Sequence, residues 1–377
     1  MLIPFVLNSI LWGTLGISLI TMVFWLYEYY LGWSQYEQPD IEHPPDAVQV
    51  RILTIGTDQA LVQQTVDSLP DAVTDIHVIT EQTIDITGAT AHVVPESFSC
   101  VAEKKGRALE WARQYVPCEK EFILYLDEDS QAHEFNGLPE ADIIQFGEKP
   151  YKTGSLIAYW VEVFRMGFQV EMRGFYLFDV PLYAWGGGIA VRTSLEDKVT
   201  WDFESIVEDT SFVWRAAKDH DIHFEYCETK FRNQAPPSLS ALIQQRRRWF
   251  AGSVSEIRLL PRRFFLISII RNLSWVISVF IPIMMIAVLF PFPLFMPFGV
   301  FGLLSTGLAM FLLSWAITGI RYMDEKYIFT GVILTLAPVL SIINALGAAY
   351  GAIQPPDGFA VTEKASNSTI TNVTESD

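Results

Sequence analysis

The sequence has few cysteines and few basic residues for its length. Its 377 residues include three cysteines, Cys100, Cys118 and Cys227, and none lies in a C-x-x-C or Cys/His pattern. These spacings argue against a disulfide scaffold and against a structural zinc site. Lysine and arginine together number 26, against 43 aspartates and glutamates, which gives a formal net charge of −17. That balance argues against nucleic acid as a partner, because a nucleic-acid backbone must be neutralised by basic side chains.

Charge of either sign is also sparse. Only 18% of the residues are charged, half are hydrophobic, and the mean hydropathy is +0.26. This composition excludes a disordered chain and a simple soluble domain. The length allows one sizeable domain with a membrane portion, or two modest domains. An acidic surface poor in lysine suits a protein that stays hydrated in high salt, so we expect a halophilic source, with an ordinary acidic protein as the alternative.

Long uncharged runs predict membrane segments. Residues 2–27 contain no charge and are long enough to cross a bilayer. The run lacks the basic start and the short apolar core of a signal peptide, so it predicts a retained anchor. From 264 to 353 the chain is again almost continuously apolar, with breaks at a proline-rich stretch and at Arg321–Lys326. These breaks predict three further apolar segments, near 266–290, 296–320 and 327–353.

The basic residues that flank these segments predict their orientation. Arg258, Arg262 and Arg263 precede the first segment of the second region, and Arg321 and Lys326 follow the next one. Both groups should be cytoplasmic, which makes 266–320 a hairpin that crosses out and back. The last segment either spans the membrane or is split by Pro338, Gly347 and Gly351 into a re-entrant or interfacial helix. Glycosylation sequons at Asn367 and Asn372 would suit an outside tail.

The stretch between the apolar regions alternates between strand-like and helix-like patterns. Strands are expected at 48–55, 75–80 and 122–126, with helices at 59–69 and 103–115. Such alternation predicts an α/β fold, a mostly parallel sheet with helices on both faces. Ligands bind at the carboxyl ends of the strands in such sheets. The place to look first is therefore directly after the strand that ends near Leu126.

Three carboxylates, Asp127, Glu128 and Asp129, follow that strand. If the strand persists, side-chain alternation sends Asp127 and Asp129 to the same side. Two hard oxygen ligands on one side suit Mg²⁺ or Mn²⁺ with a bound diphosphate. The alternative is a solvated acidic loop.

Two further motifs could contact a bound ligand. Lys105 and Arg107 open a helix, where basic groups and backbone N–H groups favour an anionic ligand, although they could also form a solvated face. The run Trp185-Gly186-Gly187-Gly188 precedes an apolar strand-like piece. Its glycines allow close backbone approach and unusual dihedrals, or simply form a turn.

Carboxylates and arginines in two later helices also have two readings. Glu208 and Asp209 lie in the first turn of a helix, where a carboxylate complements the helix dipole or acts as a general base. Gln245, Arg248 and Trp249 belong to an amphipathic segment before the membrane region. Its three consecutive arginines could contact lipid head groups or clamp a diphosphate.

Taken in order, these motifs resemble glycosyltransferase family 2, in its membrane-integrated branch. The order is K-x-R-A-L, D-x-D, a glycine-rich loop, E-D, Q-x-x-R-W and F-x-V-T-x-K, and it covers about residues 48–364. Within the family, the stretches YLDEDS, FYLFDVPLYAWGGGIAV, VEDTSF and IQQRRRWFAG look like those of β-1,4-mannosyltransferases that use GDP-mannose. The resemblance implies a type A glycosyltransferase fold and an inverting, metal-dependent transfer.

The resemblance also implies roles for individual residues. Asp127 and Asp129 would engage the metal and the sugar nucleotide, with Lys105 and Arg107 near the donor. Asp209, beside Glu208, would be the base. Gln245, Arg248 and Trp249 would hold the diphosphate and the acceptor end, and the loop Trp185–Gly188 would face the acceptor. Phe359, Thr362 and Lys364 would form a gating loop over the nucleotide.

The sequence departs from the family pattern at two places. Many members carry an aspartate after the second strand, and this aspartate holds the nucleotide base. Here Thr80 and Glu81 occupy that region. Glu81 is therefore assigned to the nucleotide base only by its position. Gly186 to Gly188 stand where the similar mannosyltransferases carry bulkier residues, which leaves the acceptor open.

The whole pattern predicts an enzyme of the cell membrane. It would move mannose from GDP-mannose in β-linkage onto a lipid-linked or glycolipid acceptor. The alternatives are a processive polysaccharide synthase that uses a UDP-sugar, an inactive membrane-anchored glycan- or nucleotide-binding protein, and a transporter. A transporter should carry ionisable residues within its apolar segments, and the sequence offers only Arg271. The expected parts are an anchor (1–33), a cytoplasmic catalytic domain (48–240), amphipathic interface helices (241–263), transmembrane or re-entrant helices (264–353), and a gating loop with a polar tail (354–377).

Overall fold

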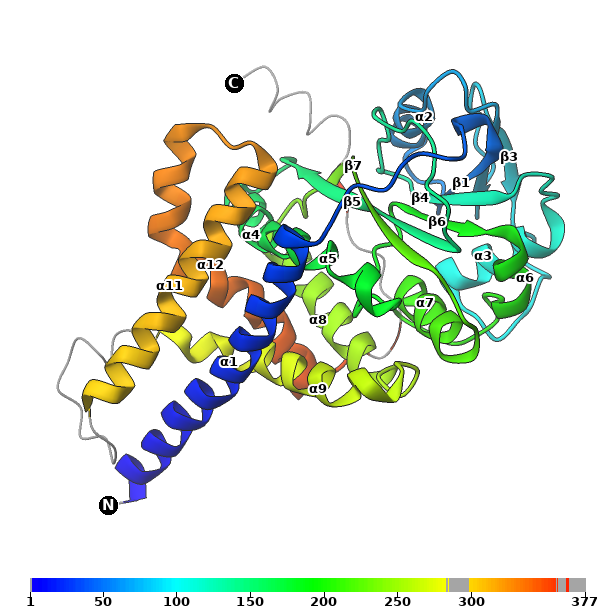
Figure 1. Ribbon diagram of the computed structural model, residues 1–377. Helices are drawn as coiled ribbons and strands as arrows, with labels where there is room; N and C mark the ends of the chain where they lie inside the picture. Colours follow the sequence, from blue (N-terminus) through cyan, green and yellow to red (C-terminus); the bar gives the residue numbers. More distant parts are fainter. Residues whose placement is uncertain (1, 283, 285–297, 357, 359–363, 366–377) are drawn as a thin grey trace.

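The computed structural model describes residues 2–282, 284, 298–356, 358, 364 and 365. In Figure 1 a twisted sheet with its helices forms one part of the molecule, and long helices form the other. The two parts meet at two shorter helices, α4 (Leu156–Arg165) and α8 (Leu239–Ser255).

The sheet has seven strands in the order β3-β2-β1-β4-β6-β5-β7. Their bounds are β1 Val48–Thr54, β2 Asp75–Thr80, β3 Thr90–Val93, β4 Phe122–Asp127, β5 Ile143–Tyr151, β6 Ile189–Arg192 and β7 Phe224–Gln234. Every pair in the sheet is parallel except those of β6, which runs antiparallel to both β4 and β5. The sheet is therefore mostly parallel, as the alternating pattern predicts.

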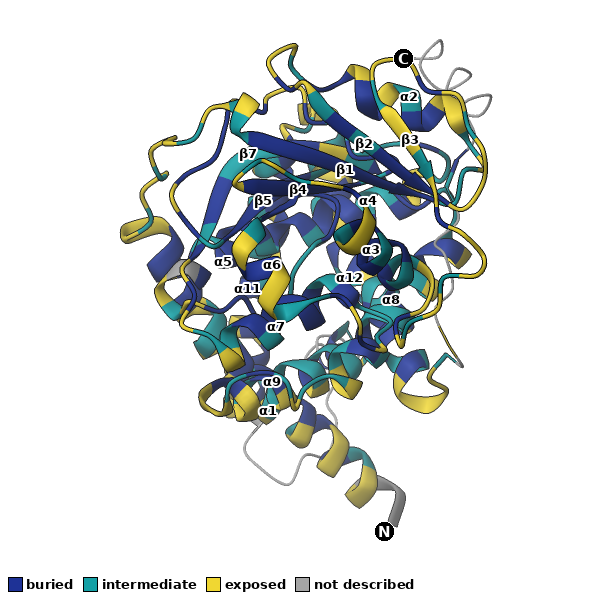
Figure 2. Cartoon of the chain, turned by 90° about the vertical axis from the view of Figure 1, so that its right-hand side faces the viewer, coloured by how far each residue is buried: buried dark blue, intermediate teal, exposed yellow. Residues whose placement is uncertain are grey.

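Helices pack on both faces of this sheet. Figure 2 shows α2 (Gln59–Asp67) on one side of the buried strands and α3 (Lys104–Tyr115), α6 (Thr193–Val199) and α7 (Glu208–Asp219) on the other. The two-residue period of β1 divides its side chains between two cores. Val50 and Ile52 pack with α2, whereas Leu53 packs with α3 and α7. This arrangement confirms the predicted α/β class.

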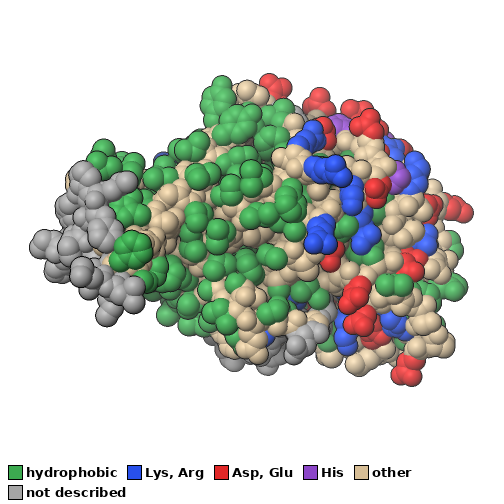
Figure 3. All heavy atoms as spheres, turned by 90° about the horizontal axis from the view of Figure 1, so that it is seen from below, with side chains coloured by type: hydrophobic (Ala, Val, Ile, Leu, Met, Phe, Trp, Pro, Cys, Tyr) green, Lys and Arg blue, Asp and Glu red, His purple; other side chains and the backbone are tan. Residues whose placement is uncertain are grey.

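Among the described residues, four helices are long and apolar enough to cross a membrane. They are α1 (Leu2–Ser34), α9 (Arg262–Ile277) with the 3-10 turn that extends it to Phe280, α11 (Phe298–Met323) and α12 (Tyr327–Ile353). In Figure 3 hydrophobic side chains cover this part of the molecule, and acidic and basic side chains gather over the sheet part. The remaining described elements are short: α5 (Gln169–Met172) and four 3-10 turns, at 45–47, 166–168, 175–178 and 278–280.

The last apolar segment forms one unbroken helix. Helix α12 is continuous through Pro338. Its glycines pack against α8 rather than breaking the helix: a Cβ on Gly347 would lie 2.4 Å from the Cβ of Arg246, and one on Gly351 would lie 2.8 Å from the carbonyl oxygen of Arg247. Gly347 and Gly351 therefore allow α12 to pack closely on α8. The sequence interpretation had assigned them to a break in the helix instead.

One expectation about charge in the apolar helices is wrong. The sequence pointed to Arg271 as the only ionisable residue there. Because α1 continues to Ser34, it also contains Glu28, whose Oε2 lies 2.8 Å from a guanidinium nitrogen of Arg271. The uncharged run ends just before Glu28, but the helix continues to Ser34 and therefore includes this residue.

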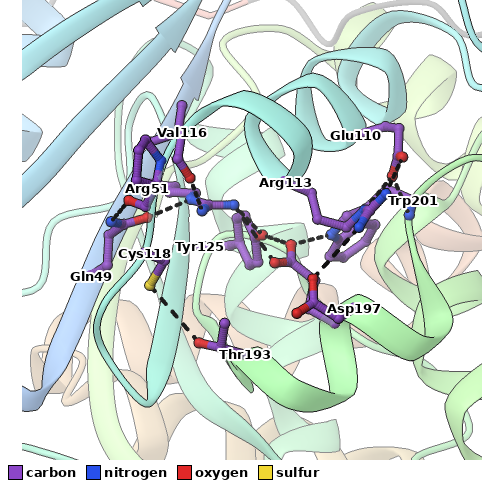
Figure 4. A network of polar contacts seen from close by, with 12 residues as sticks. Gln49, Arg51, Glu110, Arg113, Val116, Cys118, Tyr125, Thr193, Asp197 and Trp201 are labelled. Atoms are coloured by element: carbon purple, nitrogen blue, oxygen red, sulfur yellow. Dashed lines mark hydrogen bonds and ion pairs between the residues drawn. The ribbon is translucent and has the colours of Figure 1, made fainter.

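A buried polar network supports the sheet beneath α3 and α6 (Figure 4). The Nε of Arg51 donates to Gln49 at 2.8 Å, and its guanidinium lies 3.7 Å from Glu196. Glu196 in turn accepts hydrogen bonds from Tyr125 and from the indole N–H of Trp201. Arg51 is only 1% exposed, so this ion pair is part of the core.

Candidate active site

The three consecutive carboxylates at the end of β4 separate. Glu128 accepts a hydrogen bond of 2.5 Å from the hydroxyl of Thr54, at the end of β1. Asp127 and Asp129 instead lie near one cation, the ammonium of Lys364. At the strand end Asp127 and Glu128 line the cavity described below, whereas Asp129 is not part of its lining.

Asp129 joins three segments that are distant in the sequence. Its Oδ2 accepts a hydrogen bond of 2.9 Å from the backbone N–H of Gln234, at the end of β7. Its Oδ1 lies 2.6 Å from the Nζ of Lys364. The side chain of Gln234 also bonds the backbone of Ala365 in both directions. The segment after α12 is thus held to the sheet at the carboxylate.

Lys105, in the first turn of α3, lies among acidic groups. Its Nζ is 2.9 Å from Asp127 Oδ1, 3.2 Å from Asp209 Oδ2 and 3.8 Å from Glu208 Oε1. Burial acts to lower the pKa of Lys105, but the three carboxylates outweigh it and raise that pKa. The sequence placed Lys105 near a diphosphate, and the structure places its ammonium between Asp127 and the two carboxylates of α7.

Burial dominates the protonation of the carboxylates at the start of α7. It raises the pKa of Asp209, which Lys105 opposes, and it raises the pKa of Glu208 to about 7, with a further rise from Asp209. For Asp127 burial also acts to raise the pKa, but Lys105 and Lys364 outweigh it and hold the pKa below its ordinary value. The site thus favours the ionised form of Asp127, whereas Glu208 and Asp209 bind their protons more tightly than ordinary carboxyl groups do.

The glycine-rich loop lies directly against Asp209. A Cβ on Gly186 would lie 2.0 Å from Asp209 Oδ2, and one on Gly187 would lie 2.6 Å from the hydroxyl of Ser130. Neither glycine has a positive φ. The structure therefore favours the close-approach reading of these glycines over the unusual-dihedral reading.

Two polar side chains that the sequence did not single out hold this loop. The amide of buried Gln145 donates to the carbonyls of Trp185 and Gly188 and accepts from the N–H of Trp185. The hydroxyl of Thr210, next to Asp209, accepts a hydrogen bond of 3.0 Å from the N–H of Ala184. The loop is thereby fixed from β5 and from α7 itself.

The three consecutive arginines of α8 point to three different places. Arg246 is fully buried, pairs with Glu162 and donates to Asn344 of α12 at 3.1 Å. Arg247 donates to the carbonyls of Gln354 and Pro355, just after the end of α12. Arg248 donates to the carbonyl of Ile206 and lies near Glu208, Asp127 and Asp209. The described contacts therefore bring Arg248, rather than the whole run, to the carboxylates.

Trp249 and Gln245 face the same region from α8. The guanidinium carbons of Arg246 and Arg165 lie 4.3 Å and 5.2 Å from the centre of the Trp249 ring. The Oε1 of Gln245 accepts a hydrogen bond of 2.6 Å from Arg246. Cation–π contacts of this kind hold the indole in place.

The opposite end of the site is formed around Glu81. A guanidinium nitrogen of Arg107 lies 3.2 Å from its Oε2, and the Nε of Arg107 donates to the carbonyl of Phe98 at 3.0 Å. Both side chains line the same cavity as Asp127. This is where the sequence expected the nucleotide base.

One cavity of about 1100 Å³ connects these groups. It runs from Glu81 past Asp127, Asp209 and Arg248, and continues among α1, α9, α11 and α12. Of the residues expected from the sequence, it is lined by Glu81, Lys105, Arg107, Asp127, Trp185, Gly186, Glu208, Asp209, Gln245, Arg248, Trp249 and Lys364. Asp129 and the other two glycines lie behind this lining, and the expected gating residues Phe359 and Thr362 lie outside the described residues.

Asp127 and Asp129 could hold a divalent cation. Both provide hard oxygen donors, the kind that Mg²⁺ and Mn²⁺ prefer. Each already faces an ammonium group, from Lys105 and Lys364 respectively. A divalent cation at this position would therefore have to share these carboxylates with the two ammonium groups or displace them.

The model of glycosyl transferase family group 2 matches residues 122–336, more than half of the chain. The chain belongs to this family. The matched region includes β4, the glycine-rich loop, α7, α8, α9, α11 and the first part of α12. It stops before the segment that carries Lys364.

Two curated relatives are mannosyltransferases. β-1,4-Mannosyltransferase egh from Drosophila melanogaster is 27% identical over 228 aligned positions, and the match covers 53% of this chain and 50% of that protein. β-1,4-Mannosyltransferase bre-3 from Caenorhabditis elegans is 26% identical over 234 aligned positions, and the match covers 54% of this chain and 51% of that protein. The match thus spans about half the length of the curated relatives.

A solved structure supports the fold over nearly the whole chain. The mannosyltransferase PcManGT from Pyrobaculum calidifontis, solved with GDP-Man and Mn²⁺, superposes with a TM-score of 0.54 over 93% of this chain and 98% of that chain, at 11% identity. The family 2 protein described here therefore has the type A glycosyltransferase fold predicted from its sequence, together with apolar helices.

Proposed function

We propose that this family 2 protein is an inverting membrane glycosyltransferase that moves mannose from GDP-mannose, in β-linkage, onto a lipid-linked or glycolipid acceptor. The observation that carries the proposal is the single cavity in which Asp127, Asp209 and Arg248 face one another and which continues into the apolar helices. The mannosyltransferase relatives favour mannose as the sugar. Four apolar helices favour an acceptor that resides in a membrane.

In this proposal Asp209 is the general base. Its carboxylate removes the proton from an acceptor hydroxyl, which attacks the anomeric carbon from the face opposite the leaving nucleotide. One displacement inverts that centre and gives a β product from an α donor. Burial raises the pKa of Asp209, which brings its proton affinity closer to what general-base catalysis near neutral pH requires. Gly186 leaves the space in which the carboxylate sits.

The diphosphate of the donor lies between Asp127, Asp129 and Arg248. Asp127 and Asp129 would hold Mg²⁺ or Mn²⁺, which when bound supplies positive charge to the departing diphosphate. Arg248 contributes a fixed guanidinium in a buried site, where such a charge acts strongly. Lys364 adds a second cation from the segment after α12, and with the expected gating residues it would close the site against water.

The parts of the chain then take distinct roles. Residues 48–240 form the catalytic domain on the cytoplasmic side, 1–33 and 264–353 anchor it in the cell membrane, 241–263 lie at the interface, and 354–377 carry the gating loop and tail. Glu81 and Arg107 bind the nucleotide end of the donor. Trp185, the adjoining glycines, Gln245 and Trp249 face the acceptor. The cationic flanks of the apolar segments favour this orientation.

The test is a donor screen on the purified full-length protein in lipid nanodiscs. GDP-mannose, UDP-glucose, UDP-GlcNAc and UDP-glucuronate are each supplied with Mn²⁺ or Mg²⁺ and total membrane lipid, and released nucleotide and glycosylated lipid are quantified. The proposal predicts turnover of GDP-mannose with one sugar added per lipid, and loss of both signals in Asp209→Asn. A preference for a UDP-sugar with growing chains would instead make the protein a polysaccharide synthase. Absence of turnover with every donor would make it a binding protein.

A further inference from the structure

Three exposed arginines, here called the arginine patch, lie where α8 leads into α9. Arg258 belongs to the turn between the two helices, and Arg262 and Arg263 open α9. Within the described part of the chain none of the three takes part in an ion pair, and their one hydrogen bond runs from Arg263 to the carbonyl of Phe178 at 2.6 Å. Figure 3 views the molecule from the side on which α9 lies in Figure 1, and it shows basic side chains where the hydrophobic cover meets the sheet part.

The two faces of this segment differ in chemistry. Leu260 and Phe264 are buried and pack in the core that also holds α7. Residues three or four positions apart share one face of a helix, so Arg262, Leu266 and Ile269 lie together on the outward face. Leu266 is 67% exposed and Ile269 is 40% exposed. This outward stripe therefore changes from a guanidinium group to alkyl side chains within one turn, about 6 Å along the helix axis.

Arginines at other surfaces of the sheet part are matched by acids. Arg113 pairs with Glu110, and Arg192 pairs with both Glu121 and Glu140. The whole chain has a formal net charge of −17, so most of its basic side chains have acidic groups nearby to pair with. The arginine patch departs from this rule, and its guanidinium groups can bind an anion from outside the chain.

The second basic flank of the apolar helices is arranged differently. Arg321 and Lys326 share their loop with Asp324, whose carboxylate lies 3.0 Å from the Nζ of Lys149 and 3.8 Å from that of Lys230. These two lysines belong to β5 and β7, so the loop is held on the sheet part and carries acid of its own. Of the two basic flanks, the arginine patch is the one that is not neutralised by its own loop.

We propose that the arginine patch binds the phosphate groups of anionic lipids, whose acyl chains lie along the outward stripe of α9. A guanidinium group offers paired N–H donors that match phosphate oxygens. Leu266 and Ile269 contact the acyl chains, which a free phosphate ion lacks. The attraction between an anionic bilayer and a basic side chain fades within a Debye length, about 10 Å at 0.1 M salt, so nearby arginines outweigh the more distant acids of the sheet part.

The test titrates the full-length protein in a neutral detergent with dansyl-labelled phosphatidylglycerol or dansyl-labelled phosphatidylcholine. Energy transfer from tryptophan to dansyl reports binding, and no nucleotide sugar is present. The test variant is the double substitution Arg258→Gln with Arg262→Gln, because both side chains are exposed. The matched control, Lys198→Gln with Lys218→Gln, removes the same charge from exposed positions on α6 and α7.

We expect the wild type to bind phosphatidylglycerol at least tenfold more tightly than phosphatidylcholine. Arg258→Gln with Arg262→Gln should lower this ratio to less than threefold, whereas the lysine control should keep it. Raising the salt from 0.1 M to 1 M should weaken the binding of phosphatidylglycerol alone, because salt screens exposed charges. Glycerol 3-phosphate at about 5 mM should not displace the lipid, because it has no acyl chain for the outward stripe to contact.

Three outcomes would overturn the proposal. One is equal binding of the two lipids by the wild type, and another is an equal loss of phosphatidylglycerol binding in the lysine control, since overall charge would then be responsible. The third is displacement by glycerol 3-phosphate, which would make the patch a site for free phosphate. Both double variants should unfold at the wild-type temperature in neutral detergent, so lost binding reports on the patch and not on the fold. Because the assay contains no donor, its result is independent of the proposed glycosyl transfer.

Discussion

A Cβ atom on Gly186 would lie 2.0 Å from the Oδ2 of Asp209, which is closer than any van der Waals contact allows. The glycine-rich loop and the first turn of α7 therefore fit together only without a side chain at position 186. Gln145 and Thr210 hold the loop at this distance from two directions. The position of the proposed base thus depends on a residue that has no functional group.

The first prediction concerns Gly186→Ala. The added methyl must displace the carboxylate of Asp209 or the loop, and a displacement of about 1 Å at a reacting group can cost roughly 100-fold in rate. We expect kcat to fall about 10- to 100-fold while the KM for the donor changes little. Steady-state kinetics on the purified variant check this. Gly307→Ala is the matched control, because a Cβ there meets nothing within 4 Å; equal kcat values for the two variants would contradict the prediction.

The second prediction concerns the pH dependence of turnover. Burial raises the pKa of Asp209 and Lys105 lowers it, so Lys105→Met should raise that pKa further. A general base works only when it is deprotonated, so kcat/KM should rise with pH and the acid limb of Lys105→Met should lie at higher pH than that of the wild type. Rate profiles from pH 5 to pH 9 measure the shift. Exposed Lys218→Met, on the same helix as Asp209, should leave the limb in place.

The third prediction concerns the cation on Asp129. The Nζ of Lys364 lies 2.6 Å from Asp129 Oδ1 and competes with any metal ion for that carboxylate. Lys364→Met should therefore bind Mn²⁺ more tightly than the wild type in the absence of nucleotide, and should turn over GDP-mannose more slowly. Calorimetric titration with Mn²⁺ and a rate assay test both parts. Lys326→Met, at the start of α12, serves as the control; weaker Mn²⁺ binding in Lys364→Met would refute the competition.

The fourth prediction concerns stability and its pH dependence. Arg51→Met leaves Glu196 buried without its cation, and losing one partner of a buried pair costs about 3–5 kcal/mol. Burial already raises the pKa of Glu196, and Arg51 opposes the rise, so the variant raises it further. A carboxyl that binds its proton more tightly in the folded state loses stability as pH rises between its unfolded and folded pKa. The deficit should therefore be smaller at pH 5 than at pH 8.

Thermal unfolding of nanodisc-embedded protein at the two pH values measures that deficit. The double variant Arg51→Met with Glu196→Gln removes the titrating group, so its deficit should be the same at both pH values. A single variant whose deficit grows on acidification would show that Glu196 stays ionised in the folded protein.

The sequence predicted those strands and helices whose apolar residues follow a clear pattern. The apolar runs of β1, β2 and β4 and the helix patterns of α2 and α3 were recognised because their residues alternate or recur as packing requires. The edge strand β3 was missed because it is short and mostly exposed. Strands β5 and β7 were missed because they mix charged residues with apolar ones, and β7 also shifts register at Phe146/Gly147 of its partner.

The candidate site was predictable to the extent that its residues form ordered motifs. Asp127, Asp129, Asp209 and Arg248 came from such motifs, and their roles remain predictions. The contacts of Gln145 with the glycine-rich loop could not be foreseen, because they join residues about forty positions apart that form no local pattern. The pairing of Glu28 with Arg271 was hidden for the same reason, across the whole catalytic domain.

The docking of Lys364 and Ala365 on Asp129 and Gln234 has a consequence for how the protein is made. During synthesis the carboxylates of the sheet emerge long before Lys364, and the apolar helices α9, α11 and α12 lie between them in the chain. Lys364 can therefore reach Asp129 only after these three helices have been made. If the apolar helices enter a membrane as proposed, a chain that has not yet made them would still lack this cation beside its carboxylates.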